Sequence, residues 1–177
     1  IRESDILLVQ LETSLEAVQE AVRLAQTHTV PVILNPAPYQ PFPRELLKNV
    51  TYITPNETEA SLLTGIQVQD DASAEEAAKI LHSWGVPHVV ITLGKRGCLY
   101  YNGIVGKRID SFQVEAVDTT GAGDAFNGGL AHALASGQSL EEAIVYANAT
   151  AALSVTRIGT ALAMPSKAEV AKLLEKG

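Results

Sequence analysis

The chain has 177 residues, of which 46% are hydrophobic, a formal net charge of -7 and a sequence pI near 5.0. This composition predicts one domain over residues 1–177 with a sizeable core, and the negative charge argues against binding to nucleic acid. Cys98 is the single cysteine, which excludes an internal disulfide framework. The sequence shows no signal peptide and no apolar run of roughly 18–20 residues, so we expect a cytoplasmic protein that spans no membrane.

Short, almost wholly apolar runs alternate along the chain with segments whose apolar residues recur every three or four positions. The runs are typical of strands covered on both faces, and the periodic segments are typical of amphipathic helices. The expected strands are 6–11, 30–34, 52–54, 88–93, 98–101 and 107–112. The expected helices are 15–27, a turn at 44–49, 56–64, 74–84, a helix from 121, 140–155 and 167–176.

Several helix ends carry recognisable capping residues. Thr13 or Ser14 can cap the first helix, and Ser73 with Glu76 three residues later has the spacing of a capping box. Gly65 is expected to end the helix that begins near Asn56.

The order strand, helix, strand is the unit that builds parallel sheets through right-handed crossovers, so we expect an α/β fold with a mainly parallel sheet. Ligands of such sheets bind at the carboxyl ends of the strands. A composite site along one edge is therefore expected from the residues that follow the strands, which are Glu12, Asn35, Asn56, Gly94 and the turn at Asp118.

Residues 117–137, with the sequence VDTTGAGDAFNGGLAHALASG, place two carboxylates on either side of a glycine turn that opens a helix. The first N–H groups of a helix lack intrahelical partners and lie at the positive end of its dipole, so the amides of Gly121, Ala122 and Gly123 can bind an anion. Asp124 in the first turn can accept a proton from a hydroxyl. This pattern favours phosphoryl transfer.

The alternative is that Asp118 or the neighbouring threonines only cap the helix and that Asp124 only complements its dipole. Other nucleotide-binding loops do not fit. A Walker loop is absent, and Phe126 stands where the third glycine of a dinucleotide-binding turn is needed.

Four motifs occur in an order that resembles the PfkB, or ribokinase, family of carbohydrate kinases. They are LNPAP at 34–38, TPNETEA at 54–60, TLGKRG at 92–97 and DTTGAGDAFNG at 118–128. The resemblance extends from about Ser4 to Pro165. It implies a ribokinase-like three-layer αβα sandwich with a mainly parallel, Rossmann-like sheet.

The resemblance also implies which residues act on the hydroxyl, on the transferred phosphoryl group and on the phosphates of ATP. Asp124 is similar to the catalytic base that takes the proton from a sugar's primary hydroxyl, while the amides of the glycine turn would stabilise the phosphoryl group. Asn56 and Glu59 match the family's N-x-x-E motif, which is associated with Mg²⁺ and the phosphates of ATP. A helix cap is the alternative for Asn56.

Further positions that contact nucleotide and sugar follow from the same resemblance. Asn148 corresponds to a residue beside the adenine, with an ordinary polar helix position as the alternative. Glu12 corresponds to a carboxylate that contacts the ribose hydroxyls, with a solvated strand end as the alternative. The nucleotide-binding turn consists of Thr92, Leu93, Gly94, Lys95, Arg96 and Gly97.

A loop that binds a monovalent cation is implied as well. K⁺ would order the anion site electrostatically without touching the substrate. Met164 stands before Pro165 where the family has a small or hydroxyl residue, and this departs from the pattern. The implied ligands are Asp118 and Thr120 with backbone carbonyls near Ser154, Arg157, Gly159 and Ala163.

The function implied is the ATP-dependent phosphorylation of D-ribose to D-ribose 5-phosphate. Another sugar or a nucleoside as the acceptor, or a non-catalytic nucleotide-binding module, are the alternatives. The family's N-terminal sugar-binding Asp, Gly-Gly pair and lid strands are not found in the sequence. We therefore expect a C-terminal portion with little activity of its own, from a kinase that can form a homodimer through the lid.

Overall fold

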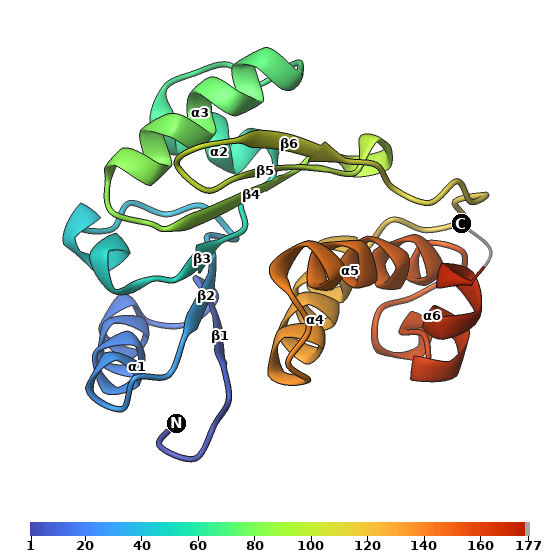
Figure 1. Ribbon diagram of the computed structural model, residues 1–177, viewed down its shortest axis with the longest axis horizontal. Helices are drawn as coiled ribbons and strands as arrows, with labels where there is room; N and C mark the ends of the chain where they lie inside the picture. The colour runs from blue at the N-terminus through green and yellow to red at the C-terminus, as the bar shows by residue number, and fades with distance from the viewer. Residues whose placement is uncertain (176–177) are drawn as a thin grey trace. The chain divides into compact units, whose positions relative to one another are not determined.

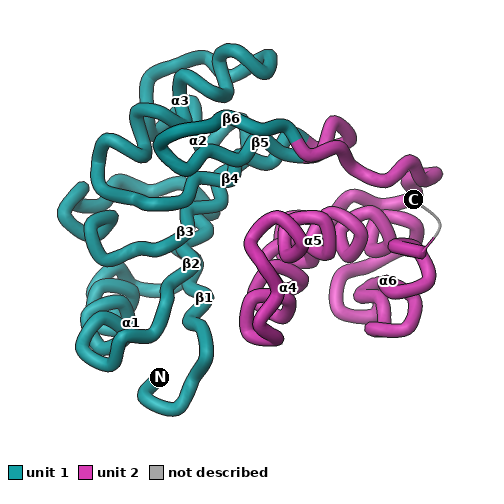
Figure 2. Tube along the Cα trace, viewed as in Figure 1, with its two compact units in different colours: residues 1–93, 98–108 teal, residues 94–97, 109–177 magenta. Residues whose placement is uncertain are grey.

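The computed structural model describes residues 1–175. The chain divides into two compact units, which Figure 2 distinguishes by colour. Unit 1 consists of Ile1–Leu93 and Cys98–Arg108, and unit 2 of Gly94–Gly97 and Ile109–Gly177. The single domain expected over residues 1–177 stays a prediction, because compact units within one chain can still fold together.

The sheet of unit 1 has its six strands in the order in which they occur along the chain (Figure 1). Strands β1 to β4 pair in parallel, and β5 runs antiparallel to β4. This confirms the α/β fold with a mainly parallel sheet. The strands are β1 (Leu7–Gln10), β2 (Val32–Asn35), β3 (Tyr52–Ile53), β4 (His88–Thr92), β5 (Cys98–Tyr101) and β6 (Gly106–Ile109), the last of which runs into unit 2.

The helices of unit 1 connect the parallel strands. Because β1 to β4 follow one another in one direction across the sheet, right-handed crossovers place their connections on the same face. Val22 of one helix and Leu81 of another share a single apolar core with Leu34 of β2. These helices are α1 (Leu15–Thr27), the 3₁₀ helix η1 (Arg44–Asn49), α2 (Glu57–Thr64) and α3 (Asp71–Ser83).

Two of the predicted helix ends are confirmed. Ser14 caps α1, and its hydroxyl accepts a hydrogen bond from the Ala17 N–H at 3.2 Å. Gly65 ends α2 with a φ of 78°, a left-handed conformation that glycine adopts without steric cost.

The predicted cap of α3 is wrong. Asp70, not Ser73, is the N-cap, and its carboxylate accepts from the Ser73 N–H at 2.8 Å. Ser73 returns the contact, because its hydroxyl oxygen accepts from the Asp70 N–H at 3.1 Å. A carboxylate cap three residues earlier adds a turn to the helix, and that turn outweighs the box that Ser73 could have formed with Glu76.

Unit 2 is built on two packed helices, α4 (Ala122–Ala135) and α5 (Leu140–Ser154), followed by the 3₁₀ helix η3 (Ala161–Ala163) and α6 (Lys167–Leu174). Gly129 allows α4 and α5 to approach closely, since a Cβ there would lie 2.7 Å from Thr150 Oγ1. The predicted end of the last helix at Lys176 lies outside the described residues.

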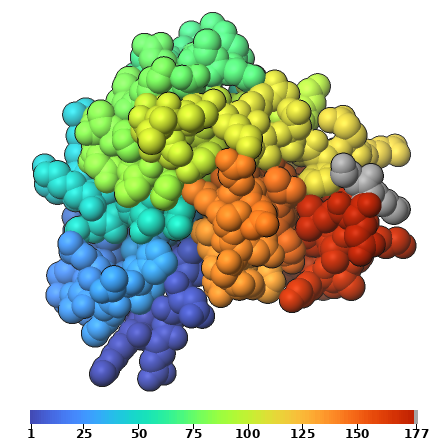
Figure 3. Space-filling view, viewed as in Figure 1, coloured from blue at the N-terminus to red at the C-terminus, as the bar shows by residue number. Residues whose placement is uncertain are grey.

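The start of the chain lies at the surface of unit 1. Residues 1–5 are exposed, and they form the dark blue projection of that unit in Figure 3. Within residues 1–175, no helix has both the length and the apolar character needed to cross a bilayer.

Candidate functional site

The glycine turn begins α4 as the sequence predicts. Gly121 is the N-cap residue with a φ of 76°, which disfavours any residue with a side chain. A Cβ at Gly121 would lie 3.3 Å from Thr160 Cγ2, so the turn packs against the loop after α5. A Cβ at Gly123 would meet nothing within 4 Å. The backbone at Gly123 is therefore open to a ligand.

The first amides of α4 differ in their availability. The Ala122 N–H donates to the Thr119 carbonyl at 3.2 Å. No acceptor within residues 1–175 takes the N–H of Gly121 or Gly123. Both groups lie at the positive end of a 14-residue helix, where an anion is stabilised by roughly 0.3–1 kcal/mol. The turn thus retains two of the three predicted donors.

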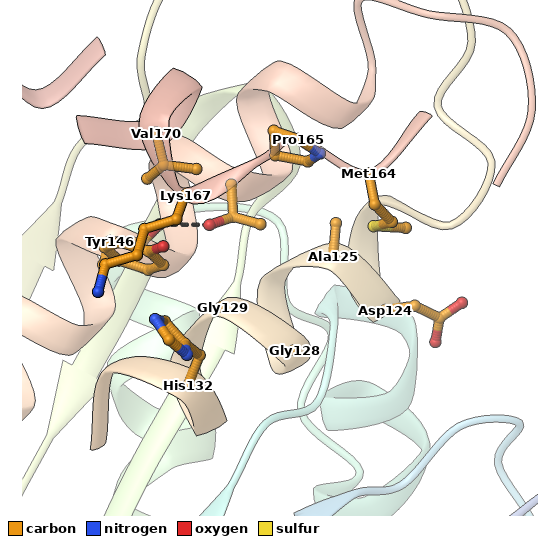
Figure 4. A pocket seen from close by; sticks show the side chains of 11 residues that line it. Asp124, Ala125, Gly128, Gly129, His132, Tyr146, Met164, Pro165, Lys167 and Val170 are labelled. Atoms are coloured by element: carbon orange, nitrogen blue, oxygen red, sulfur yellow. Dashed lines mark hydrogen bonds between the residues drawn. The ribbon is translucent and has the colours of Figure 1, made fainter. Parts of the chain in front are cut away.

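Asp124 occupies the first turn of α4, is exposed, and lines a cavity of about 280 Å³ in unit 2. In Figure 4, its carboxylate points away from His132, Tyr146 and Lys167, which lie at the other end of this cavity. The Asp124 carboxylate therefore lies at the surface of unit 2, and its role as a base stays a prediction. No sequence pattern links His132, Tyr146 and Lys167, because α4, α5 and α6 each contribute one of these three lining residues.

Asn127 was not singled out from the sequence. It is buried in α4, and its Nδ2 donates to the Gly123 carbonyl at 2.9 Å. The available signal was a polar residue between Phe126 and Leu130 on the apolar face of the helix. Its contact stabilises the turn that carries Asp124.

Asp118 joins the glycine turn to the loop after α5. One carboxylate oxygen accepts from the Thr120 N–H at 2.9 Å, and the other accepts from the Gly159 N–H at 3.0 Å. The hydrogen bond from Gly159, followed by those from Thr120, lowers the pKa of Asp118 to about 2. The carboxylate is consequently ionised at neutral pH.

The other implied ligands of the monovalent cation lie in the same part of unit 2. The carbonyl of Val155 accepts from the N–H groups of Val117 at 2.7 Å and Asp118 at 3.1 Å, which brings the two segments together. Ser154 ends α5, Arg157 and Gly159 lie in the loop that follows, and Ala163 is buried in η3. The segments that carry the implied ligands therefore lie together in unit 2, and their binding of a cation stays a prediction.

Asn56 and Glu59 form the cap of α2, so the structural alternative for Asn56 is confirmed. Asn56 Oδ1 accepts from the Glu59 N–H at 2.8 Å, and the Glu59 carboxylate accepts from the Asn56 N–H at 2.9 Å and from Asn56 Nδ2 at 3.0 Å. Glu59 is buried, and this desolvation raises its pKa, while the hydrogen bonds from Asn56 oppose the rise. A helix cap does not require its carboxylate to be buried, so the burial of Glu59 beside the exposed Asn56 is not explained by the cap alone.

We expect Glu59→Gln to match or exceed the stability of the wild type at pH 7. Glutamine keeps the capping box, and it removes a charge whose burial is unfavourable. Since the pKa of Glu59 is raised by folding, its contribution to stability is present in acid and is lost as the pH rises through that pKa. Urea unfolding at pH 7 and pH 4 should show a difference that shrinks in acid.

Glu57→Gln, in the same turn but half-buried, is the matched control and should give no gain. A Glu59→Gln protein that is less stable than the wild type at pH 7 would show that the ionised carboxylate stabilises the fold.

The nucleotide-binding turn expected at 92–97 adjoins the Asn56 motif in the sheet. The Thr92 N–H donates to the Pro55 carbonyl at 2.9 Å, and Asn56 pairs with Thr92 in an isolated parallel bridge. Gly94–Arg96 then forms a 3₁₀ turn, closed by a hydrogen bond from the Gly97 N–H to the Gly94 carbonyl at 3.0 Å. Within unit 1, Thr92 at the start of this turn therefore lies beside the Asn56 motif.

Asn148 is buried in α5, where its side chain makes contacts within unit 2. Its Nδ2 donates to the carbonyls of Ile109 at 3.5 Å and Asp110 at 3.3 Å, which fixes the segment after β6. Its role beside an adenine stays a prediction.

The predicted site residues are divided between the two units. Glu12, exposed after β1, lies in unit 1 with the Asn56 motif, while Asp118 and Asp124 lie in unit 2. The composite site expected along one edge of the sheet stays a prediction. Within residues 1–175, no three His, Cys, Asp or Glu side chains are grouped to hold a metal. Mg²⁺ commonly uses only one or two carboxylates together with substrate phosphates, so Glu59 alone is compatible with it.

Known proteins resemble this chain over most of its length. A family model described as pfkB family carbohydrate kinase matches residues 3–167. The ribokinase of Haemophilus influenzae is 46% identical over 175 residues, which are 99% of this chain and 57% of that protein. The deoxyribokinase of Salmonella typhimurium is 36% identical over 170 residues, which are 94% of this chain and 55% of that protein. The chain thus spans little more than half the length of these relatives.

A solved structure agrees with the family match. The structure of Arabidopsis thaliana ribokinase complexed with ribose and ATP has a TM-score of 0.94 and 34% identity, covering 98% of this chain and 57% of that one. The sheet and the glycine turn before a first-turn carboxylate place this chain in the α/β class of carbohydrate kinases. The chain belongs to the pfkB family of carbohydrate kinases.

Proposed function

We propose that the chain is the nucleotide-binding and catalytic portion of an ATP-dependent kinase that converts D-ribose to D-ribose 5-phosphate. The observation that carries this proposal is the position of Asp124, exposed in the first turn of α4 beside the unpaired N–H groups of Gly121 and Gly123. The relatives named ribokinase, and the solved ribokinase with ribose and ATP, support ribose as the acceptor.

The roles follow from charge and position. Asp124 takes the proton of the ribose primary hydroxyl. The hydroxyl oxygen attacks the terminal phosphorus of ATP, and the bond from that phosphorus to ADP breaks. The amides of Gly121 and Gly123 stabilise the negative charge on the transferred group. Glu59 and Asn56 would hold Mg²⁺, which would supply positive charge to offset that of the nucleotide phosphates. The proposed compartment is the cytoplasm.

The full-length protein tests this proposal through sugar-dependent release of ADP. D-ribose should give the highest kcat/KM among D-ribose, 2-deoxy-D-ribose, D-fructose and adenosine, and the product should carry its phosphate on the primary hydroxyl. Because one relative is named a deoxyribokinase, the comparison of D-ribose with 2-deoxy-D-ribose is the most informative. No sugar-dependent ADP, or a preference for another acceptor, would contradict the proposal.

A monovalent cation held by Asp118, Thr120 and the loop after α5 forms part of the proposal. Replacing K⁺ by tetramethylammonium should lower kcat severalfold, because an ion too large for the loop cannot order the glycine turn. The measurement is turnover at constant ionic strength, and equal turnover with both ions would reject the cation site. Binding of nucleotide in the two salts serves as the control.

A further inference from the structure

The loop between α5 and η3 has little apolar anchoring. None of residues 156–160 is buried, and Ile158 is 80% exposed. A segment of this kind takes its position from polar contacts more than from packing. The contacts that hold it therefore decide where Gly159 and Thr160 lie.

Two polar contacts tie this loop to neighbouring elements. On one side, the Gly159 N–H donates to Asp118, whose other oxygen accepts from Thr120 immediately before the glycine turn. On the other side, the Arg157 guanidinium forms an ion pair with Glu169 in the first turn of α6. The loop thus lies between the site and α6.

Glu169 serves two partners with different oxygens. Its Oε2 accepts from the Ser166 N–H at 2.8 Å and from the Ser166 hydroxyl at 2.9 Å, completing the capping box of α6. Its Oε1 accepts from the Arg157 guanidinium. The hydrogen bonds from Ser166, followed by that from Arg157, lower the pKa of Glu169 to about 2. The carboxylate keeps its charge throughout the neutral range.

A capping box needs only a side-chain acceptor at its third helical position, and glutamine serves as well as glutamate. The negative charge of Glu169 is therefore not required by the cap. The partner that requires it is Arg157, because a guanidinium and a carboxylate form a charge-assisted contact that an amide cannot match.

We propose that Glu169 is a positioning residue for the phosphoryl-transfer site. Through Arg157, it holds residues 156–160 where Gly159 and Asp118 orient the Gly121 turn, and it touches neither substrate. This inference rests on the proposed function and adds to it a residue outside the family's motifs as they occur in this chain.

The test compares Glu169→Gln with Ser166→Ala in the full-length protein. Glu169→Gln keeps the cap and weakens the ion pair, whereas Ser166→Ala weakens the cap and keeps the ion pair. A partly exposed pair is worth about 0.2–1 kcal/mol, so Glu169→Gln should lower kcat about 1.4- to fivefold, with KM for ATP and sugar nearly unchanged. Ser166→Ala should lower the Tm and leave kcat unchanged.

The dependence of kcat on ionic strength is a further test, because a purely structural role of Glu169 would not change it. Raising tetramethylammonium chloride from about 0.05 to 0.5 M at fixed K⁺ should bring kcat of the wild type toward that of Glu169→Gln, because salt screens the exposed pair. The same salt should change kcat of the Glu169→Gln variant less.

Hydrogen exchange of peptides covering residues 117–123 gives a readout that needs no sugar or nucleotide. Glu169→Gln should speed exchange there, and Ser166→Ala should speed it only near the start of α6. Equal exchange at 117–123 in Glu169→Gln and wild type, or equal kcat in an active enzyme, would overturn the inference. Absence of ribose-dependent turnover in the wild type would instead count against the proposed function, and the exchange result would still decide whether Glu169 orders the turn.

Discussion

Replacing Asp124 by Asn is expected to lower kcat by roughly 10²–10⁴-fold, the usual contribution of a general base. Asparagine has the same shape but cannot take the proton of the attacking hydroxyl. The open amides of Gly121 and Gly123 remain, so the Kd for nucleotide should change little. Steady-state kinetics and calorimetric titration with a non-hydrolysable ATP analogue measure the two effects separately.

The control for this substitution is Glu141→Gln, which removes a carboxylate from the first turn of α5. Both substitutions remove a charge that complements a helix dipole, worth about 0.3–1 kcal/mol, but only Asp124 lies beside the glycine turn. Unchanged turnover in Asp124→Asn would favour a role limited to the dipole. A protein that binds nucleotide normally and has no turnover even as wild type would favour the non-catalytic module.

Helix ends and the glycine turn were predictable because their causes lie within four residues of sequence. Ser14 caps α1 because its hydroxyl reaches an N–H three positions on, and Gly121 opens α4 because that turn needs a positive φ. The position of Asp124 in the first turn follows directly from where the helix begins. The fold class was predictable for a similar reason, since apolar runs and helical periods alternate along the whole chain.

The helix cap that was predicted wrongly shows where local signals conflict. Asp70 and Ser73 both satisfy the preference for a cap, three residues apart, and either could begin α3. A start at Asp70 adds a turn to the helix and uses Ser73 as the reciprocal partner of the cap. Residue preferences alone do not show which of the two starts is more stable.

The contacts that organise the site could not be predicted, because they join distant parts of the sequence. Gly159 lies 41 positions from Asp118, and Asn148 reaches a carbonyl 39 positions away. Such contacts depend on how α5 packs on α4, which the sequence pattern leaves open. The burial of Glu59 is a similar case, since the sequence indicates the cap but not its desolvation.

Replacing Gly97 by Ala should strongly destabilise the protein. A Cβ at Gly97 would lie 2.1 Å from the Ile109 carbonyl oxygen and 2.6 Å from the Ser111 N. Both atoms belong to the backbone, so no side-chain rotation relieves the clash. Asn148 also holds Ile109 and Asp110 in place, which limits how far that segment can retreat.

Gly94→Ala isolates the effect of the clash from the effect of backbone conformation. Gly94 and Gly97 both have a positive φ, of 56° and 92°, but a Cβ at Gly94 meets nothing within 4 Å. We expect Gly94→Ala to cost about 1–2 kcal/mol, the usual penalty of a left-handed residue, and Gly97→Ala to cost more than about 4 kcal/mol. Because domains are stable by only about 5–15 kcal/mol, the second variant should be largely insoluble or unfold at low urea. Equal urea midpoints for the two variants would mean that residues 109–111 yield easily, and that the turn at 94–97 is not fixed by its contact with them.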